Sequence, residues 1–137
     1  MGRVIAIDLG TKRTGLAVTD MLKITANPLE TIETSKLVDF LSKYFQAEEV
    51  DTIVLGYPKS LDGSDNEMTP RVISLKDRLG KVFPNKEIVL VDERFTSKMA
   101  MQSMIAMGSK KKDRREKAGN LDKISAAIIL QSYLQQL

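Results

Sequence analysis

The sequence predicts an α/β fold, a mixed sheet with helices packed on it, formed by a single domain over residues 1–137. Three short apolar segments follow one another closely at the start of the chain, and this spacing predicts an antiparallel meander. Helical and strand patterns then alternate, which predicts parallel crossovers. The 42% of apolar residues, with few aromatics among them, suffice for one aliphatic core.

The first part of the chain is predicted to hold three strands and a helix. Arg3–Leu9 is apolar on both faces and predicts a buried central strand, and Gly15–Thr19 predicts its hairpin partner. Ile24–Ile32 predicts a weaker third strand, in which Pro28 marks an edge or a break. Ser35 predicts the N-cap of a helix, because apolar residues follow it at helical spacing.

The second part of the chain predicts strands and helices in alternation. Thr52–Gly56 predicts another buried strand, and Thr69–Gly80 predicts the helix that follows it. Glu87–Asp92 predicts the last strand of the sheet. Two amphipathic helices, Ser97–Met107 and Leu121–Gln136, are predicted to complete the domain.

Two absent residue types limit the chemistry that this chain can perform. The sequence contains no cysteine, which excludes disulfides, thiolate zinc sites and cysteine nucleophiles. It contains no histidine either, so the commonest general base and transition-metal ligand are missing. Any catalysis must then use carboxylates, hydroxyls, lysines or a metal held by oxygen atoms, and oxygen ligands suit Mg²⁺ or Mn²⁺.

Sequence patterns also bear on where the protein works. No secretory signal is visible, and no apolar stretch approaches the roughly 20 residues that span a bilayer. We therefore expect a soluble, cytoplasmic protein that has no membrane partner.

The positive charge is concentrated in one segment. The net charge of the chain is +3, whereas the run Gly108–Gly119 alone holds six basic and two acidic residues. Such a run is either a solvated loop or a site of phosphate contact. Its candidate nucleic-acid contacts are Lys110, Lys111, Lys112, Arg114 and Arg115.

Three acidic residues stand at the ends of predicted elements. Asp8 closes the first strand, where a carboxylate either caps the turn or is paired or coordinated. Glu93 follows the last strand; it, or its neighbour Asp92, either faces the same crevice or forms a local ion pair with Arg94. Asp122 opens the last helix, where the helix dipole also favours an acid.

Convergence of these three carboxylates would suit phosphodiester chemistry. Ligands bind outside the carboxyl ends of parallel strands, so Asp8, Glu93 and Asp122 are predicted to meet at one sheet edge. Two divalent ions held there would activate a water and stabilise the leaving oxygen, without any histidine. Four further residues near strand ends are either phosphate contacts or plain surface: Lys12, Arg13, Lys59 and Ser64.

Four segments of the chain together resemble one family. Asp8–Ala17 reads DLGTKRTGLA, Gly56–Ser64 reads GYPKSLDGS, Asp92–Thr96 reads DERFT, and Asp122–Leu134 reads DKISAAIILQSYL. In this order they resemble the motifs of the YqgF/RuvX family, whose fold is similar to that of ribonuclease H and the RuvC resolvases. The resemblance runs over nearly the whole chain.

The resemblance implies a fold, an activity and a set of site residues. It implies a sheet whose first three strands are antiparallel, and a nuclease whose metal-binding acids are Asp8, Glu93 and Asp122. Members of the family are described as Holliday junction resolvases and as nucleases that mature the 5′ end of pre-16S rRNA. Five further positions match the family motifs: Lys12, Arg13, Asp62, Ser64 and Arg94.

Two other functions compete with a nuclease. Ile5–Ala17 also resembles the phosphate loop of actin-like ATPases and sugar kinases, although those proteins bind nucleotide between two lobes and this length supplies one. A non-catalytic RNA-binding module is the second alternative, and the three acids argue against it. As the nucleic-acid substrate, the resemblance to the family favours pre-rRNA over branched DNA. The oligomeric state, monomer or homodimer, stays open, although resolution of a junction would require a dimer.

Overall fold

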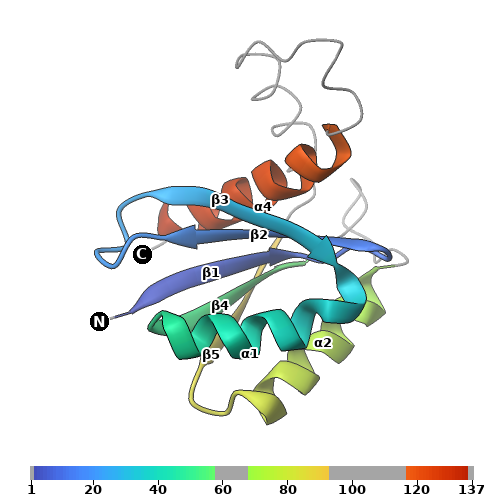
Figure 1. Ribbon diagram of the computed structural model, residues 1–137, viewed down its shortest axis with the longest axis horizontal. Helices are drawn as coiled ribbons and strands as arrows, with labels where there is room; N and C mark the ends of the chain where they lie inside the picture. Colours follow the sequence, from blue (N-terminus) through green and yellow to red (C-terminus); the bar gives the residue numbers. More distant parts are fainter. Residues whose placement is uncertain (1, 58–67, 93–116, 136–137) are drawn as a thin grey trace.

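The protein folds around one five-stranded sheet with the strand order β3-β2-β1-β4-β5 (Figure 1). The computed structural model describes residues 2–57, 68–92 and 117–135, and the side chains of all of these except 92 and 117–123. The five strands are β1 (Arg3–Asp8), β2 (Arg13–Thr19), β3 (Ala26–Glu33), β4 (Val50–Tyr57) and β5 (Glu87–Asp92).

The sheet is mixed, as predicted. Strands β1, β2 and β3 form an antiparallel meander, and β4 and β5 continue the sheet in parallel with β1. The register between β2 and β3 is irregular, because Leu16 pairs with Glu30 whereas the next residue, Ala17, pairs with Pro28. Leu29 is therefore an extra residue on the edge strand. Proline lacks the N–H of a regular ladder, so its place at this irregularity confirms the predicted edge.

Helices cover both faces of the sheet. A 3₁₀ turn η1 (Thr34–Lys36) leads into α1 (Leu37–Ala47), α2 (Thr69–Val82) precedes β5, and α4 (Lys117–Gln135) ends the described chain. None of the described helices is long and apolar enough to cross a membrane. The predicted helix over Ser97–Met107 lies outside the described residues.

The predicted N-cap at Ser35 is wrong. Ser35 lies inside the 3₁₀ turn with an exposed side chain, and α1 begins two residues later with Lys36 in the N-cap position. No side chain caps either element by a hydrogen bond. The reason is tertiary: the neighbouring Thr34 is held against the turn between β1 and β2, which draws this segment into the tighter 3₁₀ turn before the helix starts.

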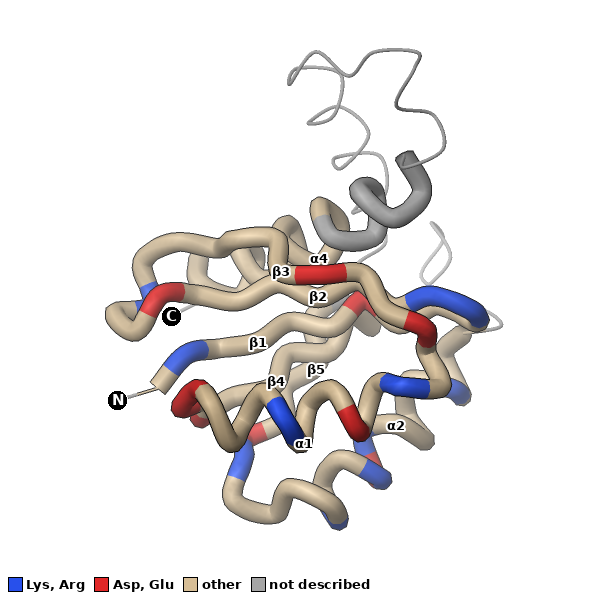
Figure 2. Tube along the Cα trace, in the orientation of Figure 1, with Lys and Arg blue, Asp and Glu red and all other residues tan. Residues whose placement is uncertain are grey.

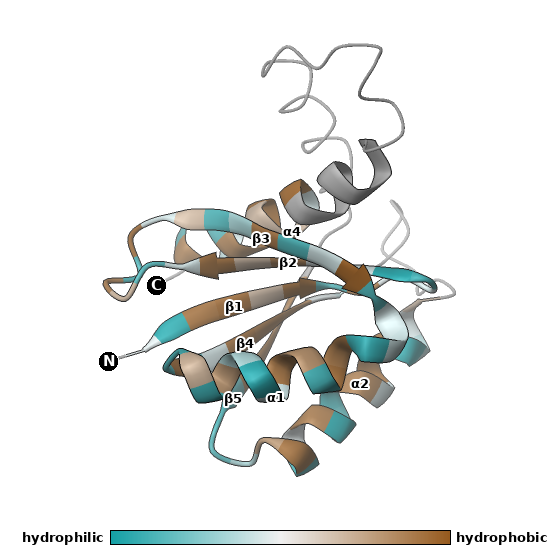
Figure 3. Ribbon diagram, viewed as in Figure 1, coloured by the Kyte–Doolittle hydropathy of each residue, from teal (hydrophilic) through white to brown (hydrophobic). Residues whose placement is uncertain are grey.

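Alternation along the strands divides the apolar interior into two layers. In β1, Ile5 and Ile7 pack with Leu41 of α1 and with buried residues of α2, whereas Val4 and Ala6 pack against α4. All four strand residues are essentially inaccessible to solvent. In Figure 3 the strands β1, β2 and β4 are largely apolar, whereas α1 and α2 carry both polar and apolar residues. The central strand is thus buried on both faces, as its unbroken apolar sequence predicts.

Alanines set the distance between α4 and the sheet. Ala6 of β1, Ala17 of β2 and Ala126 of α4 are each fully buried and belong to one cluster. Ala127 is buried in the same cluster. A side chain that ends at Cβ lets a helix backbone come close to a strand, so these alanines let α4 pack closely against the sheet.

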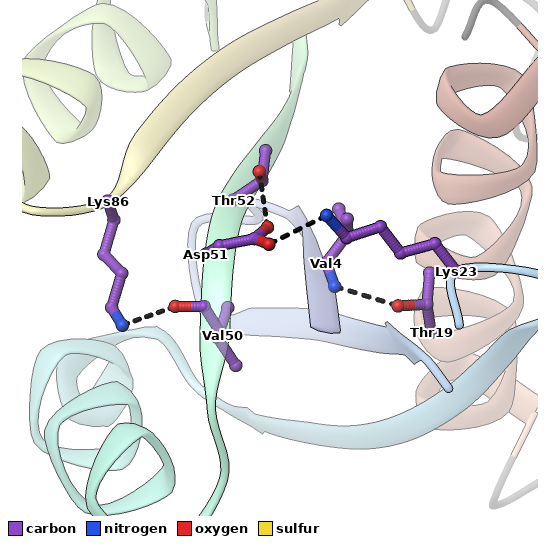
Figure 4. A network of polar contacts seen from close by, with 7 residues as sticks. All are labelled: Val4, Thr19, Lys23, Val50, Asp51, Thr52 and Lys86. Carbon is purple, nitrogen blue, oxygen red and sulfur yellow. Dashed lines mark hydrogen bonds and ion pairs between the residues drawn. The ribbon is translucent and has the colours of Figure 1, made fainter. Parts of the chain in front are cut away.

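Polar contacts secure the sheet edge at which β1 and β4 begin (Figure 4). The buried Thr19 hydroxyl accepts a hydrogen bond from the Val4 backbone N–H at 2.9 Å, which joins the end of β2 to the start of β1. On β4, the ammonium group of Lys86 donates to the Val50 carbonyl oxygen. These contacts fix the end of the sheet that lies opposite to Asp8.

An ion pair at the same edge gives the stability of the protein a predictable pH dependence. Burial raises the pKa of Asp51, but hydrogen bonds from Lys23 at 2.8 Å and from the Thr52 hydroxyl at 2.8 Å outweigh it, so the pKa lies below its ordinary value of 3.8. A carboxyl with a lowered pKa stabilises the fold above pH 3.8 and loses this contribution as the pH falls through the folded-state pKa.

We expect Asp51→Asn to reduce the loss of stability on acidification. Unfolding in urea at pH 7, 5, 4 and 3 measures this loss, and the wild-type protein should lose more of its free energy of unfolding below pH 4 than the variant does. Equal losses in the two proteins would contradict the assignment. Lys23→Met, which removes the partner instead, should act in the same direction.

Candidate functional site

Asp8 is the last residue of β1 and lies at the edge where the parallel strands end. It pairs with Gly15 across the antiparallel ladder, and its side chain is half-buried. Because Val4 and Ala6 pack on the α4 side, strand alternation turns Asp8 to the α4 side as well. The carboxyl ends of β1, β4 and β5 lie at this edge, where open α/β sheets bind ligands.

Helix α4 begins at the same edge of the sheet. Its C-terminal residues Leu134 and Gln135 line a shallow hollow with Ile24–Asn27, the end of the loop after β2 and the start of β3, at the opposite edge. Helix α4 therefore runs from the side on which β1 ends toward the opposite edge, and in Figure 1 its first turns extend beyond the sheet. Position 122 precedes the buried Ala126 by four residues, so helical periodicity places it on the face of α4 that meets the sheet.

Of the three predicted acids, the structure describes one with its side chain and a second by its backbone alone. Asp8 is described with its side chain, and Asp122 lies within α4, although its side chain is outside the described part. Glu93 follows the last described residue of β5 and is outside it too. Within the described residues, no group of three or more acidic side chains is positioned to hold a metal.

A turn fixed by Thr34 follows Asp8. The Thr34 hydroxyl donates to the Gly10 carbonyl oxygen at 2.8 Å, and the Thr34 backbone N–H donates to the Lys12 carbonyl oxygen at 2.9 Å. A hydroxyl has one proton, so the fully buried Thr14 must be the donor in its 2.8 Å hydrogen bond to the Thr34 oxygen. Thr34 therefore holds the turn between β1 and β2 from both sides.

Glycine is required at position 10 by the closeness of the turn. A Cβ atom built on Gly10 would lie 2.3 Å from the carbonyl oxygen of Arg13, closer than two such atoms can approach. The turn is therefore tight as well as clamped, and it directly follows the strand end that carries Asp8. Sequence analysis missed Thr34, which belongs to no motif and bonds to residues 20 or more positions away.

We expect Thr34→Val to destabilise the protein by about 1–2 kcal/mol, because the variant keeps the shape of the side chain but leaves the buried Thr14 hydroxyl without its acceptor. Ser35→Ala is the matched control, and an exposed hydroxyl without a capping role should change stability by less than about 0.5 kcal/mol. Urea unfolding measures both. If Ser35→Ala lost more stability than Thr34→Val, Ser35 would be the helix cap after all.

The two basic residues of the turn are exposed beside a hollow. Lys12 and Arg13 line a space of 930 Å³ together with Thr11 and Glu33. They directly follow the segment that carries Asp8, as their spacing in the sequence predicts. The other predicted nucleic-acid contacts lie outside the described residues: Lys59, Ser64, Arg94, Lys110, Lys111, Lys112, Arg114 and Arg115.

Comparison with known proteins places this chain among relatives of nearly identical length. A family model described as "RuvX: Holliday junction resolvase" matches residues 2–136. A protein of Phocaeicola vulgatus is 48% identical over 98% of this chain and 96% of its own length. A protein of Christiangramia forsetii is 48% identical over 99% of this chain and 100% of its own. Both are named "Putative pre-16S rRNA nuclease".

Solved structures show a weaker likeness. YeaZ from Pseudomonas aeruginosa is 15% identical, with a TM-score of 0.47, over 80% of this chain and 50% of that chain. A likeness of this strength carries no functional argument. The family match and the two close relatives do, and by them the chain belongs to the RuvX family.

Proposed function

We propose that this protein is a metal-dependent nuclease that matures the 5′ end of pre-16S rRNA. The observation that carries the proposal is the position of Asp8, at the carboxyl end of the central strand and on the face toward α4. The N-terminal turns of α4, with position 122 on the sheet-facing side, begin at the same edge. The names of the relatives at 48% identity support the choice of substrate.

Asp8, Glu93 and Asp122 are the proposed metal ligands. In β5, Val91 packs in the cluster on the α4 side of the sheet. Glu93 follows β5 directly in the sequence, and Asp92–Thr96 resembles a motif of the family, which supports Glu93 as a partner of Asp8.

The available donors fit a hard divalent cation. With no histidine or cysteine in the chain, every side-chain ligand at this edge must be an oxygen atom, which suits Mg²⁺ or Mn²⁺. Such ions, when bound, lower the pKa of a coordinated water and neutralise charge on the phosphate that is being cleaved. Without them, a half-buried carboxylate such as Asp8 would repel a phosphodiester.

The residues of the chain itself have three tasks in this reaction. The carboxylate of Asp8 is proposed to hold the cation on the rigid end of a strand that is paired on both sides. Lys12 and Arg13 are proposed to bind substrate phosphates next to the bond that is cut, on a turn held by Thr34. The basic run Gly108–Gly119 is proposed to add further phosphate contacts.

A second candidate function is the resolution of Holliday junctions, which the description of the family model favours. The two functions need the same acids but different assemblies. Two symmetric cuts in a junction call for a dimer with twofold symmetry, whereas trimming an RNA end can be done by a monomer.

One experiment separates the two functions. Purified protein is incubated with Mg²⁺ or Mn²⁺ and either an RNA that carries the 5′ extension of 16S rRNA or a four-way DNA junction. We expect metal-dependent cleavage of the RNA at a defined position. Symmetric nicking of the junction without RNA cleavage would select the resolvase instead. Absence of cleavage on both substrates, and on precursor ribosomal particles, would leave a non-catalytic RNA-binding module as the better explanation.

A further inference from the structure

A second hollow lies on the other side of the sheet edge that carries Asp8. It has a volume of 540 Å³ and is lined by the turn after β1, by the segment that leads into α1 and by α2 from Pro70 to Arg78. Its floor is apolar and includes Leu9 and Leu75. Leu9 and Gly10 belong to the first family motif, but the proposed function does not use this space.

The wall of this hollow formed by α2 is basic. Arg71, Ser74 and Arg78 line it, and all three side chains are exposed. Their spacing of three and four residues places them along one face of the helix, with the two arginines about 10 Å apart along its axis. The acidic residue in the lining is Asp39 of α1, so the two guanidinium groups leave a net positive charge. Arginine side chains of this kind bind phosphate oxygens in a bidentate manner.

The hollow adjoins the one beside the basic turn. Gly10 and Ser35 line both spaces, so a path leads from Lys12 and Arg13 to the arginines of α2. Basic residues occur on the turn between β1 and β2 and again along α2 (Figure 2). A ligand that spans the whole path would have to be longer than the small molecules that fill a single pocket of this volume.

We propose that this path binds a single-stranded segment of the substrate as it leaves the candidate active site. Its phosphates contact Arg71 and Arg78, and its sugars and bases lie over the apolar floor at Leu9 and Leu75. The described lining holds no aromatic side chain, so binding rests on backbone charge and carries little sequence preference. The inference rests on the proposed function, since it requires a nucleic acid at Asp8.

Binding by charge-matched variants tests the path. Arg71→Gln/Arg78→Gln removes two positive charges from the wall of the hollow. Lys76→Gln/Lys81→Gln removes two from exposed positions of the same helix that lie outside the lining. Affinity is measured with the catalytically impaired Asp8→Asn protein as background. The ligands are one RNA with a single-stranded extension on either side of the cleavage position and the same RNA without extensions.

We expect the arginine pair to weaken binding of the extended RNA about tenfold and to leave binding of the trimmed RNA unchanged. In a plot of the logarithm of the binding constant against the logarithm of the salt concentration, the slope should become shallower by about 1.4. This is the change expected when two contacts to a single strand are lost. The lysine pair should weaken both RNAs slightly and equally. If the two variants bind the extended RNA equally well, the proposed binding path is refuted, whereas the proposed nuclease function is not affected.

Crosslinking gives a second, independent readout. The chain has no cysteine, so Ser74→Cys introduces a unique thiol between the two arginines, which can carry a photoreactive group. We expect it to crosslink the single-stranded extension, whereas Lys76→Cys on the same helix should not. Crosslinking at both positions alike would overturn the inference. Absence of cleavage and of RNA binding by the wild-type protein would instead refute the proposed function on which it rests.

Discussion

Replacement of Asp8 with asparagine is expected to lower kcat/KM for metal-dependent cleavage by about 10³-fold or more, which corresponds to roughly 4 kcal/mol of transition-state stabilisation. Asparagine has nearly the same shape, so packing at the half-buried end of β1 should persist. It lacks the negative charge that draws a divalent cation, and its neutral amide is a poorer ligand. Affinity for RNA should stay equal or rise, because a charge that repels phosphate has been removed.

The matched control is Asp77→Asn, which makes the same substitution at an exposed position of α2. It should retain the cleavage rate of the wild-type protein within a few-fold. Circular dichroism and urea unfolding establish that both variants are folded. If Asp8→Asn cleaves as fast as the control, Asp8 is a turn residue and the active site lies elsewhere.

The strand pattern of the sheet could be predicted because each strand carries its own signal. An unbroken apolar run predicts a strand buried on both faces, and Arg3–Asp8 has clusters on both sides. Pro28 predicts an irregular edge strand, and it sits at the break in register on β3. The bounds of β3 were shifted by two residues at the start, since Asp20 accepts hydrogen bonds from the backbone N–H groups of Ile24 and Thr25 and holds them in a turn.

The start of α1 could not be predicted because the decisive contacts are not local. A serine ahead of a helical pattern is a good cap on statistical grounds, and Ser35 fits this rule. Thr34, its neighbour, instead bonds to the turn between β1 and β2, and this contact draws the segment into a 3₁₀ turn. The competing contact joins residues 24 positions apart, and no local pattern encodes it.

The candidate site could be predicted in its chemistry more fully than in its geometry. The absence of histidine and cysteine restricts the ligands to oxygen, and Asp8 was identified from its place at a strand end. The convergence of Asp8 with Glu93 and Asp122 stays a prediction, supported by the orientation of α4. The basic wall on α2 escaped sequence analysis, because Arg71 and Arg78 become part of a path only when α2 packs beside the turn after β1.

The closeness of α4 to the sheet leads to the second large effect that we expect. Ala126→Leu adds three carbon atoms at a fully buried position against Ala6 and Ala17, and the helix must retreat or the strands must bend. Overpacking of this kind costs about 1–3 kcal/mol of unfolding free energy. Position 122 lies one helical turn earlier on the same face, so a retreat of about 1 Å would misplace it relative to Asp8 and lower kcat about 10²-fold.

Gln131→Leu controls for the introduction of a leucine into α4, because it places the same apolar side chain at an exposed position of the helix. It should alter stability by less than about 0.5 kcal/mol and leave cleavage intact. Ala126→Leu should show its loss in kcat at saturating metal and at temperatures where the variant is folded. If the variant is destabilised but cleaves normally, α4 contributes to the fold alone, and Asp122 is not part of the catalytic set. If the variant loses both stability and kcat, the packing of Ala126 against the sheet is needed to position Asp122.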